Sequence, residues 1–518
     1  MLGTQTIVRH WRRLDTVLRH LVRQQCSAMD GNRVTAGIII VGDEILKGQT
    51  QDTNSHFICR RLFALGVEVK RVSVIGDDLD DIATEVLEFS RNYTHVITSG
   101  GVGPTHDDMT FEGVAKAFST STAPHPELVQ VLKDYFGPDD LDSAKMKMAQ
   151  IPSTAKLQYG VHKTTGERTK YPLVSVNNVY MFPGVPSLME RAFLLLEDLF
   201  RNPDVTFHTE ELYINRTESS IAQEIKTVAD QFGKSVVIGS YPDFHNSYYQ
   251  VKISLESTSQ DQLHKASVQI KSSVPAGSVV LFEKDPVGTA AEHVYDIVNS
   301  KVDDAFHSSV RHAVSIIEQA LDKYTLKDIC LGFNGGKDCT LLLHLFHAVV
   351  LRKYPDEIGK LQALYIRSRL PFPEVELFVQ QACKRYNLEL IRYEGRIKEN
   401  LASLKDGHPN IKAVLMGTRK TDPYSDHLES FSMTDADWPQ FMRVNPILDW
   451  TYETVWTFLR TLCLPYCSLY DHGYTSLGSM NNTHPNPSLQ IVDSNGIVSY
   501  KPAYQLLDNG NERDGRNV

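Results

Sequence analysis

Apolar and polar positions alternate between two spacings along residues 33–205 and predict an α/β domain. Runs rich in apolar, β-branched residues predict buried strands at Thr35–Val41, Val67–Val74 and His95–Thr98. Between them, residues 52–65 and Asp78–Asn92 place apolar side chains at helical spacing. The order strand, helix, strand, helix, strand predicts a doubly wound parallel sheet, in which ligands bind beyond the carboxyl ends of the strands.

Residues 206–300 predict a smaller α+β unit. Strands are expected at Glu210–Asn215, Ser235–Ser240 and Tyr248–Leu255, and helices at Glu218–Phe232 and Gln260–Ser272. The segment carries no obvious catalytic constellation, so we expect it to act as a spacer or to mediate dimerisation.

Residues 301–518 predict a second α/β domain with a parallel sheet. The expected strands are Ile329–Phe333, Gln362–Ile366, Leu388–Tyr393 and Ala413–Met416, with a helix over Phe372–Tyr386. The fold class is therefore α/β, with two parallel-sheet α/β domains joined by a small α+β unit.

Bulk composition narrows the classes of function. The chain has 518 residues, whereas a single hydrophobic core stops growing at roughly 250–300 residues, so we expect more than one domain. Its net charge of −10 argues against a nucleic-acid partner. Its longest apolar runs fall far short of the roughly 20 residues that span a membrane, so we expect no membrane association. Seven cysteines without a Cys-x-x-Cys pair indicate a reducing compartment and argue against a disulfide framework or a structural zinc site.

The N-terminus differs from the rest of the chain. Residues 1–29 carry five arginines and one acid, Asp15, with apolar residues at helical spacing. This pattern is typical of a mitochondrial presequence, which we place within residues 1–32, although a surface helix or a disordered segment is the alternative. We therefore expect the protein in the cytoplasm, the mitochondrial matrix or both.

A glycine-rich loop follows the first predicted strand of the C-terminal domain. Residues 334–340 read NGGKDCT and lead into an almost wholly apolar helix. The N-terminus of a helix behind such a loop binds anions, because its N–H groups point at the ligand. Lys337 adds a positive charge, and Asp338 either complements the helix dipole or holds Mg²⁺. The spacing is not that of a Walker A motif, and a purely structural turn is the alternative.

A second loop at a strand end, residues 417–423, combines a glycine with cations and an acid. Arg419 in this loop can pair with a phosphate in bidentate fashion. An exposed salt bridge is the alternative role for this arginine.

Two loops after predicted strands of the N-terminal domain place glycines beside acids. The candidate residues of a phosphate or metal site there are Asp43, Glu44, Gly100, Gly101, Gly103, Asp107 and Asp108. Glycine N–H groups can surround an anion, and paired carboxylates suit a metal that neutralises phosphate charge. The alternative is a sharp turn with solvated carboxylates.

This N-terminal domain resembles the molybdopterin-binding domain family, and within it the branch of the competence/damage-inducible proteins. The strings GDEIL at 42–46, TSGGVGPTHDD at 98–108 and FPGVP at 182–186 carry the resemblance. The family includes pterin binders, and the branch includes pyrophosphatases that act on nucleotide diphosphate sugars. The resemblance implies hydrolysis of FAD with a divalent metal at Asp107 and Asp108, or else a regulatory or structural module.

The C-terminal domain resembles the eukaryotic FAD synthases of the PAPS-reductase-like superfamily. FNGGKDCT at 333–340, MGTRKTDP at 416–423, PYCSLYDHGYTSLGS at 465–479 and ERDGR at 512–516 follow in that family's order. Together with the N-terminal domain, the architecture resembles the animal type of this family. The resemblance implies an FMN adenylyltransferase that uses ATP and Mg²⁺ and forms FAD and pyrophosphate.

The resemblance also implies residue roles. The catalytic set is Asn334, Lys337, Asp338, Arg513 and Arg516. The set that binds the ATP phosphates is Gly335, Gly336, Lys337, Gly417 and Arg419. The flavin set is Asp422, Asp435 and Trp438, and the implied Mg²⁺ ligand is Asp338.

Two other enzymes with a similar loop are the competing interpretations. A PAPS-type reductase needs a redox cysteine near its C-terminus, whereas the last cysteine here is Cys467. A tRNA-modifying ATP pyrophosphatase needs a basic surface, which the acidic composition argues against.

We further expect that the protein forms a homo-oligomer and that it delivers FAD to apo-flavoproteins.

Overall fold

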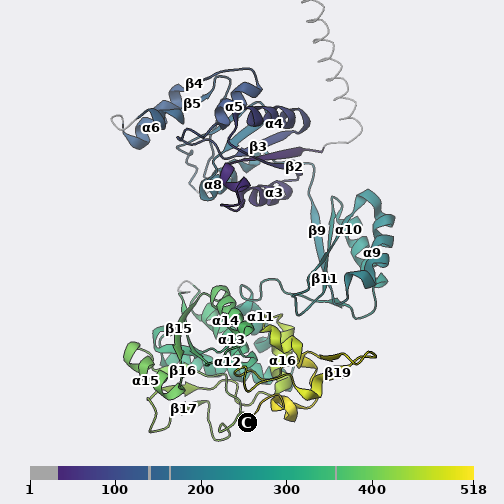
Figure 1. Ribbon diagram of the computed structural model, residues 1–518, viewed down its shortest axis with the longest axis vertical. Coiled ribbons are helices and arrows are strands. Elements are labelled where there is room, and N and C mark those ends of the chain that lie inside the picture. Colours follow the sequence, from purple (N-terminus) through teal and green to yellow (C-terminus); the bar gives the residue numbers. More distant parts are fainter. Residues whose placement is uncertain (1–32, 138–141, 163–164, 356–358, 518) are drawn as a thin grey trace, which may run out of the picture. The chain divides into compact units, whose positions relative to one another are not determined.

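The computed structural model describes residues 33–137, 142–162, 165–355 and 359–517 (Figure 1). By its internal contacts the chain divides into two compact units. The first unit extends to Glu210 and includes Ile225–Gly239 and Ser254–Ile270. The second comprises Glu211–Glu224, Ser240–Ile253 and Lys271–Val518. The presequence predicted within residues 1–32 lies outside the described residues. None of the described helices is long and apolar enough to cross a membrane.

A six-stranded sheet organises the first unit, in the order β2-β1-β3-β8-β7-β6. Its strands are β1 (Thr35–Val41), β2 (Glu68–Ile75), β3 (His95–Ser99), β6 (Lys156–Gln158), β7 (Leu173–Val176) and β8 (Val179–Phe182). The first three confirm the predicted strands, and β8 continues the parallel part beside β3. The edge is antiparallel instead, because a tight turn in which Asn177 has φ 52° joins β7 to β8 as a hairpin.

Helices cover both faces of this sheet. They are α2 (Asp43–Leu46), α3 (Asn54–Ala64), α4 (Leu79–Asn92), α5 (Thr110–Ala117), α6 (Pro126–Phe136), α7 (Ser143–Lys147) and α8 (Pro186–Leu196). Side chains alternate across β1, so Ile38 packs with residues of α3 and α8 and Ile39 with residues of α4 and α5. A short pair, β4 (Thr122–Pro124) and β5 (Gln150–Pro152), is antiparallel. The predicted doubly wound arrangement is confirmed.

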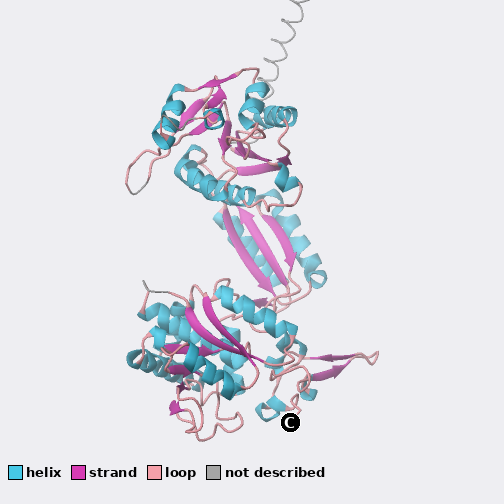
Figure 2. Ribbon diagram, turned by 60° about the vertical axis from the view of Figure 1, so that its left-hand side comes forward, coloured by secondary structure: helices cyan, strands magenta, loops and turns pink. Residues whose placement is uncertain are grey.

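The middle segment forms a four-stranded sheet in the order β10-β11-β9-β12. Its elements are β9 (His208–Ile214), α9 (Glu218–Phe232), β10 (Val237–Pro242), β11 (Val251–Ser257), α10 (Gln260–Ser273) and β12 (Val279–Val280). Figure 2 shows both helices on one side of this sheet. Strand β11 starts later than predicted, because residues 243–250 form a loop closed by a hydrogen bond from the Asp243 N–H to the Gln250 carbonyl.

A second six-stranded sheet lies in the C-terminal part, in the order β15-β14-β13-β16-β18-β17. Its strands are β13 (Ile329–Gly332), β14 (Leu361–Arg367), β15 (Leu388–Glu394), β16 (Ala413–Leu415), β17 (Phe431–Met433) and β18 (Met442–Val444). All neighbours are parallel except β17, which pairs with β18 in the antiparallel sense. The four predicted strands are confirmed.

The helices of this part are α11 (Ala290–Asn299), α12 (Ala305–Lys323), α13 (Lys337–Lys353), α14 (Pro373–Arg385), α15 (Ile397–Gly407) and α16 (Tyr452–Thr461). Every residue of α13 from Thr340 to Val350 is buried, which explains why the sequence there is almost wholly apolar. A hairpin of β19 (Gln490–Val492) and β20 (Val498–Tyr500) follows. The predicted fold class, two α/β domains joined by a small α+β unit, is confirmed.

Candidate functional site

The glycine-rich loop lies where the strand order of the second sheet reverses. The chain passes from β13 to β14 and β15 on one side, and then returns to β16 on the other side of β13. The loops after β13 and β16 therefore meet at the topological switch point, where open α/β sheets bind ligands. They approach closely, because a Cβ on Gly417 would lie 3.0 Å from the backbone nitrogen of Cys339.

The loop after β13 uses part of its hydrogen-bonding capacity internally. Gly335 has φ 75°, which favours glycine. Asn334 Oδ1 accepts the N–H of Gly336 at 2.9 Å, and the N–H of Lys337 donates to the Tyr470 hydroxyl at 2.9 Å. The next N–H groups, in the first turn of α13, have no partner within the helix. Backbone donors of this kind, at the start of a helix, favour an anion.

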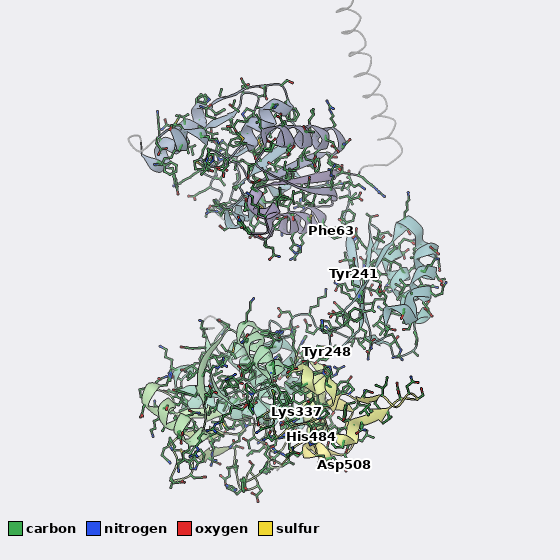
Figure 3. The ribbon with its side chains drawn as sticks, in the orientation of Figure 1. Phe63, Tyr241, Tyr248, Lys337, His484 and Asp508 are labelled. Carbon is green, nitrogen blue, oxygen red and sulfur yellow. The ribbon has the colours of Figure 1, made fainter. Side chains whose placement is uncertain are left out.

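Four charged side chains from three separate segments meet at the start of α13, and we call them the charge cluster. They are Lys337, Asp338, Arg419 and Glu512. Of these, Lys337 is labelled in Figure 3. Lys337 Nζ lies 3.0 Å from Asp338 Oδ2 and 2.6 Å from Glu512 Oε1. Arg419 Nε lies 2.8 Å from Asp338 Oδ1, and its Nη2 lies 2.5 Å from Glu512 Oε1. Each cation thus contacts both carboxylates.

Burial sets the electrostatics of the charge cluster. Lys337 and Arg419 are each 2% exposed, and buried charges persist only when they are paired. Burial acts to raise the pKa of Asp338, but the charges of Lys337 and Arg419 outweigh it and hold that pKa below its ordinary value. Burial acts to lower the pKa of Arg419, but Asp338 and Glu512 outweigh it and raise that pKa. Asp338 and Arg419 therefore stay ionised at neutral pH.

The C-terminal arginines lie beside this cluster. Arg513 Nη2 donates to Asp422 Oδ1 at 2.9 Å, and Asp422 Oδ2 accepts the N–H of Arg419 at 2.9 Å. Burial and then the charge of Arg513 lower the pKa of Arg516. The structure thus brings Asn334, Lys337, Asp338, Arg419, Asp422 and the two arginines to one end of the sheet.

The other two flavin candidates lie in the connection between β17 and β18. Asp435 Oδ1 lies 3.4 Å from Arg443 Nη2, and the Lys398 ammonium lies 5.6 Å from the centre of the Trp438 ring. No hydrogen bond or ion pair among the described residues joins Asp435 or Trp438 to the charge cluster. Their role toward a flavin stays a prediction.

Glu512 and Tyr470 are site residues that the sequence reasoning missed. Both stand inside strings already recognised, Glu512 in ERDGR and Tyr470 in PYCSLYDHGYTSLGS. Glu512 could have been found from its position, because it directly precedes Arg513, which is implied in catalysis. Tyr470 offered no such signal, because a single tyrosine in a segment of mixed polarity has no distinctive spacing.

The N-terminal candidates also lie at a switch point, between β1 and β3. A Cβ on Gly100 would lie 2.0 Å from the Val41 carbonyl oxygen, so the glycine permits the two loops to touch. The Asp43 N–H donates to Asp77 Oδ2 at 3.0 Å. Burial raises the pKa of Asp77, and the charges of Glu44, Asp43 and Asp107 raise it further. The hydrogen bond from the Asp43 N–H lowers this pKa but does not outweigh them.

Asp107 and Asp108, the predicted metal ligands of this domain, differ in their hydrogen bonds and exposure. Asp108 Oδ2 accepts the N–H of Thr105 at 2.8 Å and also its hydroxyl, so this carboxylate closes the turn. Asp107 is 60% exposed. Among the described ranges of the chain, no group of three or more His, Cys, Asp and Glu side chains is arranged to hold a metal ion.

Three family descriptions match the chain. Residues 37–202 match "Probable molybdopterin binding domain", and residues 206–283 match "FAD synthase, middle domain". Residues 328–485 match "Phosphoadenosine phosphosulfate reductase domain".

Similar proteins cover the chain to different extents. "Probable FAD synthase" of Caenorhabditis elegans is 40% identical over 508 residues, which are 93% of this chain and 97% of that protein. "Flavin adenine dinucleotide synthase" of Saccharomyces cerevisiae is 31% identical over 41% of this chain and 79% of its own length. A crystal structure of Candida glabrata FMN adenylyltransferase with FMN and an ATP analogue is 26% identical, with a TM-score of 0.42, and covers 45% of this chain and 99% of that chain.

Proposed function

This chain belongs to the FAD synthase family, and from that premise we propose that residues 301–518 transfer the AMP group of ATP to FMN, which yields FAD and pyrophosphate. The observation that carries the proposal is the charge cluster at the switch point of the second sheet. It places two buried cations beside the first turn of α13, where phosphates bind. The yeast relative supports an activity that needs only part of the chain, since 41% of this chain matches 79% of that protein.

The reaction is an in-line displacement at phosphorus. An oxygen of the FMN phosphate attacks the α-phosphorus of ATP, a new P–O bond forms, and the bond to the bridging α–β oxygen breaks. The electron pair leaves with pyrophosphate. The attacking oxygen is already an anion, so no general base is required, and the task of the protein is to position the groups and to neutralise charge.

The described residues divide this task. We assign Lys337 and Arg419 to neutralise the leaving pyrophosphate, together with the first-turn N–H groups of α13. Arg513, held by Asp422, and Arg516 supply further positive charge toward the transferring phosphoryl group. Asn334 fixes the loop through the Gly336 N–H, which keeps the backbone donors in place.

Mg²⁺ fits the carboxylate of Asp338. Its Oδ1 forms an ion pair with Arg419 Nε at 2.8 Å but accepts no hydrogen bond among the described residues, and the side chain is 21% exposed. Proteins usually hold Mg²⁺ by one or two carboxylates together with substrate phosphates and waters, so one aspartate is a sufficient protein ligand. The bound ion would neutralise charge on the phosphates.

Asp338→Asn in the full chain tests the proposal. We expect FAD formation from FMN, ATP and Mg²⁺ to fall by at least about 100-fold, the scale of losing one electrostatic stabiliser. Asp406→Asn, at an exposed position of α15, is the matched control and should keep wild-type activity. Unchanged FAD formation by Asp338→Asn would contradict the assignment of the site.

The N-terminal domain carries a second candidate function, hydrolysis of FAD to FMN and AMP. Asp43, Asp77 and Asp107 lie near one another at the switch point of the first sheet, and this negative charge favours it. These side chains do not by themselves form a metal site, so a divalent metal would have to be held together with the pyrophosphate of FAD. The full chain should release AMP from FAD when a divalent metal is added. Asp107→Asn should abolish the release and leave FAD synthesis within twofold of wild type. No AMP with any divalent metal would leave the domain regulatory or structural.

We also propose a mitochondrial form of the protein, on the arginine-rich composition of residues 1–29. Residues 1–32 fused to a fluorescent protein should direct it to mitochondria, and a cytoplasmic signal alone would contradict this.

A further inference from the structure

Glu512 is the common partner of the two buried cations. Its Oε1 lies 2.6 Å from Lys337 Nζ and 2.5 Å from Arg419 Nη2, so one carboxylate oxygen joins the loop after β13 to the loop after β16. The side chain is 11% exposed. Asp338 contacts the same cations through two different oxygens, Oδ2 for Lys337 and Oδ1 for Arg419. Within the charge cluster, Glu512 is therefore the residue that joins both cations at a single atom.

The backbone around Glu512 is anchored independently of its carboxylate. The Thr475 hydroxyl donates to the Glu512 carbonyl at 2.7 Å, and the Asn486 amide donates to the Asn511 carbonyl at 2.6 Å. Thr475 and Asn486 are at most 1% exposed. The N–H of His484 adds a bond to the carbonyl of Gly515 at 2.9 Å. A substitution at the carboxylate therefore leaves the path of the C-terminal segment supported.

We propose that Glu512 is a positioning residue of the adenylyl-transfer site, which holds the Lys337 ammonium and the Arg419 guanidinium at the separation that receives the leaving pyrophosphate. This inference rests on the function proposed above. The two cations repel each other in a buried place, where charge interactions are stronger than in water. A carboxylate oxygen between them offsets that repulsion and fixes their geometry before substrate arrives, which is the preorganisation that phosphoryl transfer needs.

The charge balance gives the proposal a distinctive signature. The four members of the charge cluster carry two formal positive and two formal negative charges. Loss of the Glu512 charge leaves the site more positive, so a polyphosphate anion should bind it more tightly. The same loss releases the two cations from their common partner, so transfer should slow. Binding of pyrophosphate and turnover should thus change in opposite directions.

The test is Glu512→Gln in the full chain, with FAD formation and its inhibition by inorganic pyrophosphate measured together. We expect kcat to fall by about tenfold or more, the inhibition constant of pyrophosphate to fall severalfold, and the KM for FMN to stay within twofold. Glu512→Asp keeps the charge but withdraws it by one methylene, so its kcat should fall while pyrophosphate inhibition stays near wild type. Glu389→Gln, exposed on the edge strand β15, is the matched control.

Two results would overturn the proposal. One is a Glu512→Gln enzyme with kcat and pyrophosphate inhibition both within twofold of wild type. The other is a fall in kcat together with weaker pyrophosphate binding and a lower melting temperature, because that pattern indicates a merely structural role. If the wild type and Glu389→Gln formed no FAD, the proposed function itself would fail, which keeps the two failures distinct.

Discussion

At the scale of the residue, Arg419 links three parts of the site. Its Nε lies 2.8 Å from Asp338, its Nη2 lies 2.5 Å from Glu512, and its backbone N–H donates to Asp422. Its Nη1 has no hydrogen-bond partner among the described residues although it is buried. An unpaired buried donor is costly, so this N–H is suited to a substrate phosphate.

Arg419→Lys should therefore not behave as a conservative change. An ammonium cannot contact two carboxylates and a phosphate in one plane as the guanidinium fork does. We expect kcat/KM for ATP to fall by about 100-fold, measured as FAD formation in the full chain. Arg396→Lys, at an exposed position, is the control and should stay near wild type. A loss of less than threefold in Arg419→Lys would contradict the bridging role.

At the scale of the element, local spacing was enough to predict the buried strands and the helices between them. Thr35–Val41 and Glu218–Phe232 were predicted with the bounds that the structure has. The antiparallel strand β17 was not predicted, because a strand of three residues has too few positions to show a period. The charge cluster was predicted only in part, since Glu512 meets Lys337 across 175 positions and spacing carries no such information.

A buried histidine in α13 gives this element a pH dependence. Burial lowers the pKa of His344 to about 3, with a smaller contribution from His347. Because the unfolded chain binds this proton below about pH 6.5 and the folded chain does not, the histidine costs no stability above that pH and lowers stability as the pH falls from 6.5 toward 3.

His344→Gln should remove that dependence. Between pH 7.5 and 5.5 the wild type should lose about 1.4 kcal/mol more of its free energy of unfolding than the variant does. Denaturant unfolding of both proteins at the two pH values, followed by the fluorescence of the C-terminal tryptophans, measures the difference. Equal losses in the two proteins would show that His344 is protonated in the folded state as readily as in the unfolded chain.

At the scale of the whole molecule, part of the middle segment belongs to the second compact unit. The Tyr248 hydroxyl lies 2.5 Å from the Leu464 carbonyl oxygen, and the Arg460 guanidinium lies 4.1 Å from the centre of the Tyr248 ring. Ser247 donates to Asp471 at 2.5 Å, next to the Tyr470 that contacts the glycine-rich loop. Residues 240–253 thus help to support the segment behind the site.

Tyr248→Phe should weaken this support without touching the chemistry. The Leu464 carbonyl would lose a buried donor, which costs about 1–3 kcal/mol. We expect the temperature at which synthase activity is lost irreversibly to fall by several degrees, while kcat measured at low temperature stays within twofold. Tyr241→Phe, exposed in β10, should change neither quantity. An unchanged inactivation temperature in Tyr248→Phe would contradict the supporting role.

We propose that the site around Lys337 and Asp338 transfers the AMP group of ATP to FMN. Incubation of the full chain with FMN, Mg²⁺ and ATP labelled at the α-phosphorus tests it most directly. We expect the label to appear first in FAD, in a one-to-one ratio with unlabelled pyrophosphate, and Asp338→Asn to form both at least about 100-fold more slowly. Label recovered in ADP, no labelled FAD at any time, or FAD formed equally well by Asp338→Asn, would contradict it.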